Sequence, residues 1–284
     1  MASRSSQEAP TARPGALDAL RRNLDDNALG PVRTLGRTVE LVLHSLVSMV
    51  ADLLRGRVQF REIVVQAWFL VSVTAIPAFL MAIPFGVIVT IQIGSIVNQI
   101  GAGSLMGAAS GLTVIQQAAP MAAGLLLGGA GASAIAADLG SRTIREEVDA
   151  MRVMGIDPVR RLVVPRILAA AFVAPLLCVF ITVVGIGAAY YLAIAGQDVT
   201  PGSYWLSFGA YATTRDFGFA LFKAVIFGIM IAVLGCQHGL EAKGGARGVA
   251  DAVNTTVVVS TVGIIVLNFA LTQIYTTYFP MRVG

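Results

Sequence analysis

Apolar residues run along this chain in blocks long enough to cross a lipid bilayer. Residues 63–137 carry no Asp, Glu, Lys or Arg, and residues 167–197, 217–237 and 252–281 form three further blocks that are nearly free of charge. A membrane-spanning helix needs roughly 20 mostly apolar residues. The first block therefore has room for two crossings and each of the others for one. The pattern predicts an all-α integral membrane protein with five transmembrane helices.

A polar-leaning stretch, residues 92–117, divides the first block. It contains amides, serine and several glycines, which interrupt the apolar run. We therefore expect one span to end near Ile96 and the next to begin near Ile115. Residues 98–114 are the predicted loop between them.

Residues inside the first two predicted spans affect helix shape and packing. Pro77 and Pro84 each remove a backbone donor from the first span and are expected to bend it, as a gate requires, although static helices bend at proline too. Gly124, Gly128 and Ala132 lie four residues apart in the second span, where small side chains let helices approach closely. They indicate a packing interface, either inside one bundle or with a second subunit.

The composition agrees with a polytopic membrane protein. Of the 284 residues 56% are hydrophobic and 13% are charged, a balance that soluble globular domains do not have. The two cysteines fall inside predicted spans, and two histidines without a nearby cysteine set cannot build a metal cluster. We expect no metal site and no nucleic-acid partner, since the net charge of +4 follows from membrane topology.

The charges between the spans predict the orientation, because loops rich in Lys and Arg stay in the cytoplasm. Residues 141–166 hold six arginines, and the N-terminal segment is also rich in arginine. On the opposite side residues 98–114 have no Lys or Arg and residues 195–216 have one. We expect a multi-pass protein of the plasma or inner membrane, with its N-terminus in the cytoplasm and its C-terminus in the periplasm.

Two segments precede the spans. Residues 1–34, rich in Ser, Ala, Pro and Arg, predict a flexible extension. Residues 35–62 repeat apolar side chains at helical spacing between arginines, which is typical of an amphipathic helix lying in the cytoplasmic interface. A short segment that enters the membrane and returns is the alternative, disfavoured by the arginines at both ends. The five-span domain then occupies residues 63–281.

Lys223 is the one charged residue well inside a predicted span. An intramembrane ionisable group is a functional candidate by default. The alternatives are that its long side chain snorkels to the interface or that it bonds to backbone carbonyls. Without a second charged group in the bilayer, a proton or sodium relay lacks partners, which argues against ion-coupled transport.

Residues 141–158 form a charged segment between the second and third spans. Apolar residues recur at steps of three and four from Ile144 to Met154, with charged residues on the other face, so a short cytoplasmic helix is expected. Gly155 can end this helix and Pro158 can begin the next one. The segment either docks a soluble partner or is a connector and nothing more.

The same residues resemble a known family. The run EEVDAMRVMGIDP at 146–158, followed by 161–166, is similar to the signature of the MlaE/YrbE permeases, the membrane subunits of ABC transporters that work with MCE-domain proteins. Lys223 and the glycine-rich residues 244–248 are similar to the second half of that family. Residues 137–147 look like the A-type YrbE subunits of actinobacterial (mycobacterial) Mce systems.

The resemblance implies a role for the charged segment, since it would be the coupling helix that sits in a cleft of a cytoplasmic ABC ATPase. It also implies a second YrbE/MlaE-type permease, with a heterodimer favoured, MCE-domain proteins on the outer side, and a lipid cargo such as fatty or mycolic acids, sterols or phospholipids. The residues expected to carry ATPase coupling are Arg145, Glu146, Glu147, Asp149, Ala150, Met151, Arg152, Met154, Gly155, Ile156, Asp157 and Pro158.

The chain lacks the motifs of an enzyme. No phosphate-binding loop with its lysine and hydroxyl occurs, so ATP and Mg are expected in the partner ATPase and no cofactor in this chain. Two histidines offer no nucleophile and base pair either. Two alternatives to an ABC permease stay open: an ion-coupled secondary carrier, which needs paired intramembrane charges, and a non-transporting membrane scaffold.

Overall fold

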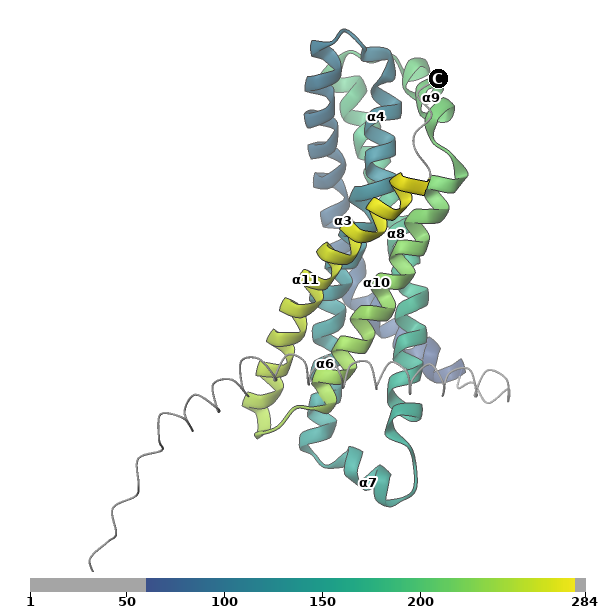
Figure 1. Cartoon of the computed structure of the whole chain (residues 1–284). Coiled ribbons are helices and arrows are strands. Elements are labelled where there is room, and N and C mark those ends of the chain that lie inside the picture. The colour runs from purple at the N-terminus through teal and green to yellow at the C-terminus, as the bar shows by residue number, and fades with distance from the viewer. Residues whose placement is uncertain (1–59, 279–284) are drawn as a thin grey trace, which may run out of the picture. The chain divides into compact units, whose positions relative to one another are not determined.

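The computed structural model describes residues 60–278, and within that range every regular element is a helix (Figure 1). Five helical segments are long and apolar enough to cross a membrane, which confirms the predicted all-α protein with five spans. The predicted extension at 1–34, and all but the last three residues of the interfacial helix at 35–62, lie outside the described residues. The spans are α3 (Phe60–Gln99), η2 to α6 (Gly103–Ile144), η5 and α8 (Val159–Gln197), α10 (Thr214–Leu240) and α11 (Gly245–Tyr278).

The first span, α3, is a single helix that continues through Pro77 and Pro84. Its buried stripe packs against α8 (Val164–Gln197), and the backbones come so close that a Cβ added at Gly86 would overlap the carbonyl oxygen of Gly185. Only glycine permits this approach. A gating role for the two prolines stays a prediction. The stripe repeats at every third or fourth residue and consists of Gln66, Leu70, Thr74, Ala78, Ala82, Gly86, Thr90, Gly94 and Val97.

The second span begins at Gly103, so the predicted loop at 98–114 is wrong. Only a turn at residues 100–102, with Gly101 at a φ of +68°, separates this span from α3. The small residues that read as a loop instead permit close packing, since a Cβ at Gly107 would overlap the backbone of Tyr204. The span runs on through η2 (Gly103–Leu105), α4 (Met106–Thr113), the π-helical turn η3 (Val114–Ala118), α5 (Ala119–Leu126), the π-helical turn η4 (Leu127–Gly131) and α6 (Ala132–Ile144).

The small residues predicted to form a packing interface face other helices of the same chain. A Cβ at Gly124 would lie 3.0 Å from the ring of Phe227 on α10, and one at Gly128 would lie 2.8 Å from the side chain of Ile264 on α11. Ala132 is fully buried. The missing side chains therefore make room for α10 and α11. Contact of these residues with a second subunit stays a prediction.

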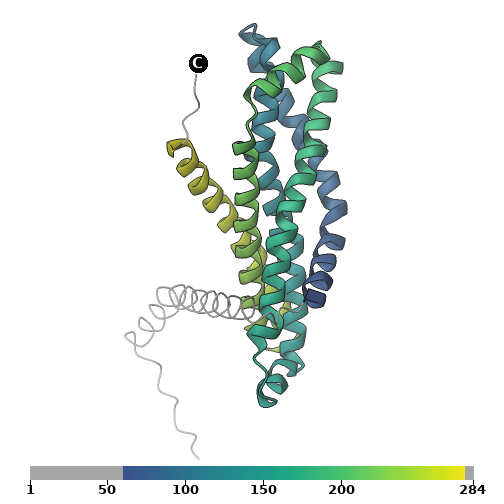
Figure 2. The same cartoon turned by 90° about the vertical axis from the view of Figure 1, so that its right-hand side faces the viewer.

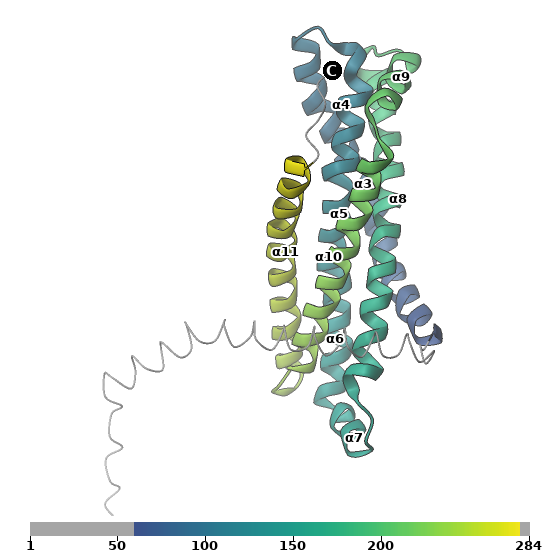
Figure 3. The same ribbon diagram turned by 45° about the vertical axis from the view of Figure 1, so that its right-hand side comes forward.

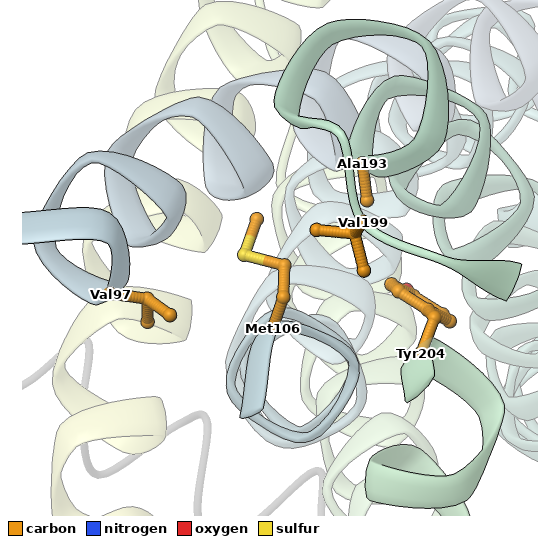
Figure 4. Close-up of a cluster of buried hydrophobic side chains, with 5 residues drawn as sticks. All are labelled: Val97, Met106, Ala193, Val199 and Tyr204. Carbon is orange, nitrogen blue, oxygen red and sulfur yellow. The ribbon is translucent and has the colours of Figure 1, made fainter. Parts of the chain in front are cut away.

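A short helix, α9 (Pro201–Tyr211), packs across one end of the bundle, which we call the α9 end. Thr200 caps this helix by accepting a hydrogen bond from the Ser203 amide at 3.4 Å. Tyr204 is fully buried, and burial raises the pKa of its phenol above the ordinary value. Around it a buried apolar cluster joins the ends of α3, α4, α8 and α9 (Figure 4), and its members are Val97, Met106, Ala193, Val199 and Tyr204.

The last span, α11, is attached to the bundle mainly along its first half. Gly244 and Gly245, with φ of +83° and +74°, make the tight turn that leads into it from α10. Its buried residues are Thr256, Ser260 and Ile264, and none follows them. Figure 2 shows α11 leaning away from the other spans toward its C-terminal end.

The contact between α3 and α8 generates a prediction about folding. Gly86→Val should destabilise the bundle by about 1–3 kcal/mol or more, because the new side chain forces two backbones apart. Gly187→Val is the matched control, since nothing lies within 4 Å of a Cβ there. Thermal unfolding of the two detergent-solubilised variants, followed by size-exclusion chromatography, checks this. Equal melting temperatures would contradict it.

Candidate functional site

The connector between the second and third spans, residues 145–158, lies at the end of the bundle opposite α9, and we call this the α7 end (Figures 1 and 3). A short helix, α7 (Glu147–Val153), forms its middle. Glu146, with a φ of 61°, interrupts the helical backbone before α7, and Gly155, with a φ of +74°, interrupts it after α7. The left-handed backbone at both breaks sets α7 at an angle to the spans on either side.

The helix in this connector is shorter than the predicted segment 141–158. Residues 141–144 belong to α6, because the helix of the second span continues to Ile144 before the break at Glu146. Of the residues expected to carry coupling, Pro158 is buried and Glu147, Met151 and Asp157 are half-buried. The exposed ones are Arg145, Glu146, Asp149, Ala150, Arg152, Met154, Gly155 and Ile156.

The connector presents apolar side chains on its surface. Val153 is 89% exposed and Met154 66%, and Ile156 beside them is exposed as well, whereas Val148 points inward and is buried. These side chains lie among charged residues, and apolar groups exposed together are typical of an interaction surface. Sequence reasoning missed Val153, because it assigned the apolar face of the helix to residues in register with Val148.

The charged residues of the connector form exposed ion pairs. Arg145 Nε lies 3.1 Å from Glu147 Oε1, and Arg152 Nη1 lies 2.9 Å from Asp149 Oδ1. Exposed pairs of this kind contribute about 0–1 kcal/mol to stability. Their charges therefore contribute little to folding and are accessible to a partner.

A buried ion pair closes the base of the connector. Arg166 on α8 is 2% exposed, and its Nη2 donates to a carboxylate oxygen of Asp138 on α6, while its Nη1 donates to the carbonyl of Leu162 at 2.6 Å. Arg142 Nε donates to the other oxygen of Asp138 at 3.2 Å. The second and third spans are thus tied together where they meet the connector. In the sequence this ion pair is indicated only by the positions of Asp138 and Arg166, which are opposite charges at the borders of two consecutive apolar blocks.

Lys223 lies inside the bundle rather than at its surface. Its side chain is 1% exposed, so it does not snorkel to the interface. The ammonium donates to the Gln116 carbonyl at 3.2 Å, to Asn268 Oδ1 at 3.4 Å and to Thr272 Oγ1 at 2.7 Å. Gln117 accepts from Asn268 at 3.2 Å and donates to Thr272 at 3.3 Å. The lysine therefore joins the second span, α10 and α11.

A carboxylate belongs to the same hydrogen-bond network as this lysine, and it lies just before the predicted span 217–237. Asp216 is buried in the first turn of α10, which begins at Thr214 rather than near Phe217. It accepts from the Gln116 side chain at 2.9 Å and from the Tyr275 hydroxyl at 2.7 Å. We call the whole set the polar cluster, and its members are Gln116, Gln117, Asp216, Lys223, Asn268, Thr272 and Tyr275.

Apart from Lys223, the members of the polar cluster were not predicted from the sequence. Amides in apolar spans, such as Gln116 and Asn268, are the signal that marks them, because a polar side chain in hydrocarbon needs a partner. The sequence does not show which of these side chains meet. Their meeting depends on the rotation of three helices about their axes.

Comparisons with known proteins agree with this architecture. The model of a family described as "Permease MlaE" matches residues 63–274, which include the connector, Lys223 and nearly all of the five spans. A protein of Synechocystis named as a probable ABC transporter permease is 30% identical over 219 residues, which cover 77% of this chain and 83% of the relative.

Two further relatives are named for lipids. The Intermembrane phospholipid transport system permease protein MlaE of Haemophilus influenzae is 24% identical over 247 residues, covering 85% of this chain and 92% of the relative. The chloroplastic protein TRIGALACTOSYLDIACYLGLYCEROL 1 of Arabidopsis thaliana is 29% identical over 190 residues, covering 67% of this chain and 54% of the relative.

The buried pair at the base of the connector should matter far more for stability than the exposed pairs. Arg166→Gln should cost about 1.5–3 kcal/mol, because it removes a buried, charged hydrogen-bond donor from Asp138, which keeps only Arg142. Arg152→Gln, the control, removes an exposed pair and should cost about 1 kcal/mol or less. Thermal unfolding of both variants, measured as for the glycine variants, checks the difference. A melting temperature for Arg166→Gln no lower than that of the control would refute the structural role of the pair.

Proposed function

The chain belongs to the MlaE permease family, and on that premise we propose that it is the membrane subunit of an ABC transporter that moves lipids across the cell envelope. The observation that carries the proposal is the connector, where charged residues and exposed apolar side chains stand together at one end of an otherwise apolar bundle. Two relatives named for lipids support the cargo class. ATP and Mg then bind to a separate ATPase subunit.

In this proposal α7 is the coupling helix. Val153 and Met154 enter a cleft of the ATPase, and the neighbouring charges orient the contact. The left-handed residues Glu146 and Gly155 keep α7 at its angle. Because Arg166 ties α8 to α6 through Asp138, a push on α7 moves the second and third spans together.

The remaining partners follow from the resemblance rather than from geometry. A second YrbE/MlaE-type permease pairs with this chain, most simply as a heterodimer of the A-type subunit with a relative. MCE-domain proteins dock at the α9 end. Since residues 141–166 hold six arginines, the α7 end faces the cytoplasm and the C-terminus the periplasm. Fatty acids, mycolic acids, sterols and phospholipids are the candidate cargoes.

One observation favours a second candidate, an ion-coupled carrier. Lys223 and Asp216 lie in the same buried network and supply the two intramembrane charges that a relay needs. Gln116 separates them, however. Its backbone carbonyl accepts from the lysine and its side-chain amide donates to the carboxylate, and neither group exchanges protons readily. Lipid movement by the purified chain in liposomes under an ion gradient, with no ATPase present, would favour the carrier.

The ATPase contact is tested by placing charges on the exposed apolar residues of α7. Val153→Asp with Met154→Asp should lower recovery of the ATPase in a mild-detergent pull-down at least tenfold, a loss of about 1.4 kcal/mol or more. Leu206→Asp is the control, because this residue is equally apolar and 78% exposed but lies on α9. Mass spectrometry quantifies the recovered subunits. Undiminished ATPase recovery from the double variant would refute the docking role of α7.

A further inference from the structure

The C-terminal half of α11, residues 265–278, contributes no buried side chain to the bundle. Figure 2 shows this half standing apart from the other spans. The first half is held differently, since Thr256, Ser260 and Ile264 are all fully buried there. The two halves of one helix thus differ in how firmly they are packed.

Polar contacts attach this C-terminal half to the bundle. Asn268 and Thr272 accept from Lys223, and the Tyr275 hydroxyl donates to Asp216 while its ring stacks on Phe219 with centroids 4.2 Å apart. Single hydrogen bonds between membrane helices contribute little to helix association. Such an attachment can open and close without disturbing the apolar packing of the first half.

The ammonium of Lys223 has neutral partners only. Its three acceptors are a backbone carbonyl, an amide and a hydroxyl, and no carboxylate of residues 60–278 lies within ion-pair distance of it. A cation removed from water is costly unless an anion compensates it. An anion adds a direct Coulomb attraction to the ammonium that a neutral acceptor lacks, and this attraction is stronger where water is excluded. An anionic ligand could therefore displace the two acceptors on α11.

We propose that Lys223 binds the anionic headgroup, a phosphate or a carboxylate, of the lipid that the transporter moves. With the C-terminal half of α11 packed, Asn268 and Thr272 occupy the ammonium. When this half swings out, the ammonium keeps the Gln116 carbonyl in the π-helical turn η3 and takes the headgroup in their place. The inference rests on the proposed lipid transport and deepens it, by naming an acidic lipid as the substrate class.

The surroundings of the lysine fit a lipid better than a free anion. The ring of Phe219 lies 5.2 Å from the ammonium and shields it on one side. Phe222 on α10 is 53% exposed and Phe269 on α11, next to Asn268 in the chain, is 72% exposed. Phe222 adjoins Lys223 in the sequence, and these two exposed rings offer acyl chains an apolar surface on α10 and α11. A free phosphate would gain nothing from them.

The first test measures lipids bound to the transporter complex purified in mild detergent. Lys223→Met should reduce bound acidic lipid about tenfold relative to neutral lipid, whereas Lys223→Arg, which keeps the cation, should retain most of it. Arg215→Met is the control, since it removes an exposed cation one residue before Asp216. Mass spectrometry of extracted lipids gives the ratio. Recovery of the ATPase in the same samples tests the proposed function separately.

Two outcomes would overturn the proposal. One is a Lys223→Met complex that holds as much acidic lipid as the unchanged complex. The other is a complex that binds radiolabelled inorganic phosphate through Lys223 but holds no acidic lipid above the level of the Lys223→Met variant, because the site would then recognise the anion alone.

A cross-linking experiment tests the same proposal without replacing the lysine. Gln117→Cys with Asn268→Cys joins the C-terminal half of α11 to the second span, and Gly128→Cys with Ser260→Cys joins the first half as a control, because a Cβ at Gly128 lies 3.5 Å from that of Ser260. Both pairs are built after Cys178→Ala and Cys236→Ala remove the native thiols. A short bis-methanethiosulfonate reagent forms the links as two mixed disulfides with release of methanesulfinate, and a reductant cleaves them.

The two links should have different effects on the same protein. The link at 117 and 268 should abolish binding of acidic lipid added in nanodiscs. Reduction should restore the binding, since the C-terminal half of α11 is then free to move again. The link at 128 and 260 should leave binding unchanged. Full binding of acidic lipid with the first link closed would show that α11 need not move, and would overturn the proposal.

Discussion

Hydrocarbon offers no partner to a charged or polar group, so each buried cation of this protein must find its partners within the chain. Arg166 finds Asp138 and the Leu162 carbonyl, and Lys223 finds groups on the second span and α11. Leu162 precedes Arg166 by only four residues, whereas Asp138 and the partners of Lys223 lie on other spans. These contacts tie each buried cation to a neighbouring span.

The two cations are compensated in different ways, and the two ends of the bundle differ accordingly. Arg166 is paired with a full anion and is almost completely buried, so the helices that it joins behave as one unit. Lys223 is held by neutral groups, some of them on a helix half that is otherwise loosely packed. Rigidity at the connector suits transmission of a mechanical push, whereas a weak attachment at the polar cluster suits reversible opening.

The five spans and the turn at Gly155 could be predicted from the sequence, because hydropathy and glycine conformation are local properties. The start of the second span could not be predicted, since Gly107 and Ser110 are typical loop residues and only the structure shows that both contact Tyr204 on α9. The polar cluster could not be predicted from the sequence for another reason. Gln116 and Asn268 can be recognised as polar from the sequence, but their contact with Lys223 depends on how three helices are rotated. Val153 was missed because an exposed valine and a buried one look alike in a sequence.

The close contact of α3 with α8 restricts how this protein can change shape. At Gly86 and Gly185 the two backbones touch, with no side chain between them that could change rotamer to absorb a displacement. Sliding one helix along the other would drive the Cα or carbonyl of one glycine into its neighbour, and separating the helices would open a void that lipid chains fill poorly. The two helices are therefore constrained to move as one body, so that any displacement of α8 carries α3 with it. In the proposed transport cycle, movement relative to this pair is left to α11, whose C-terminal half has no buried residue.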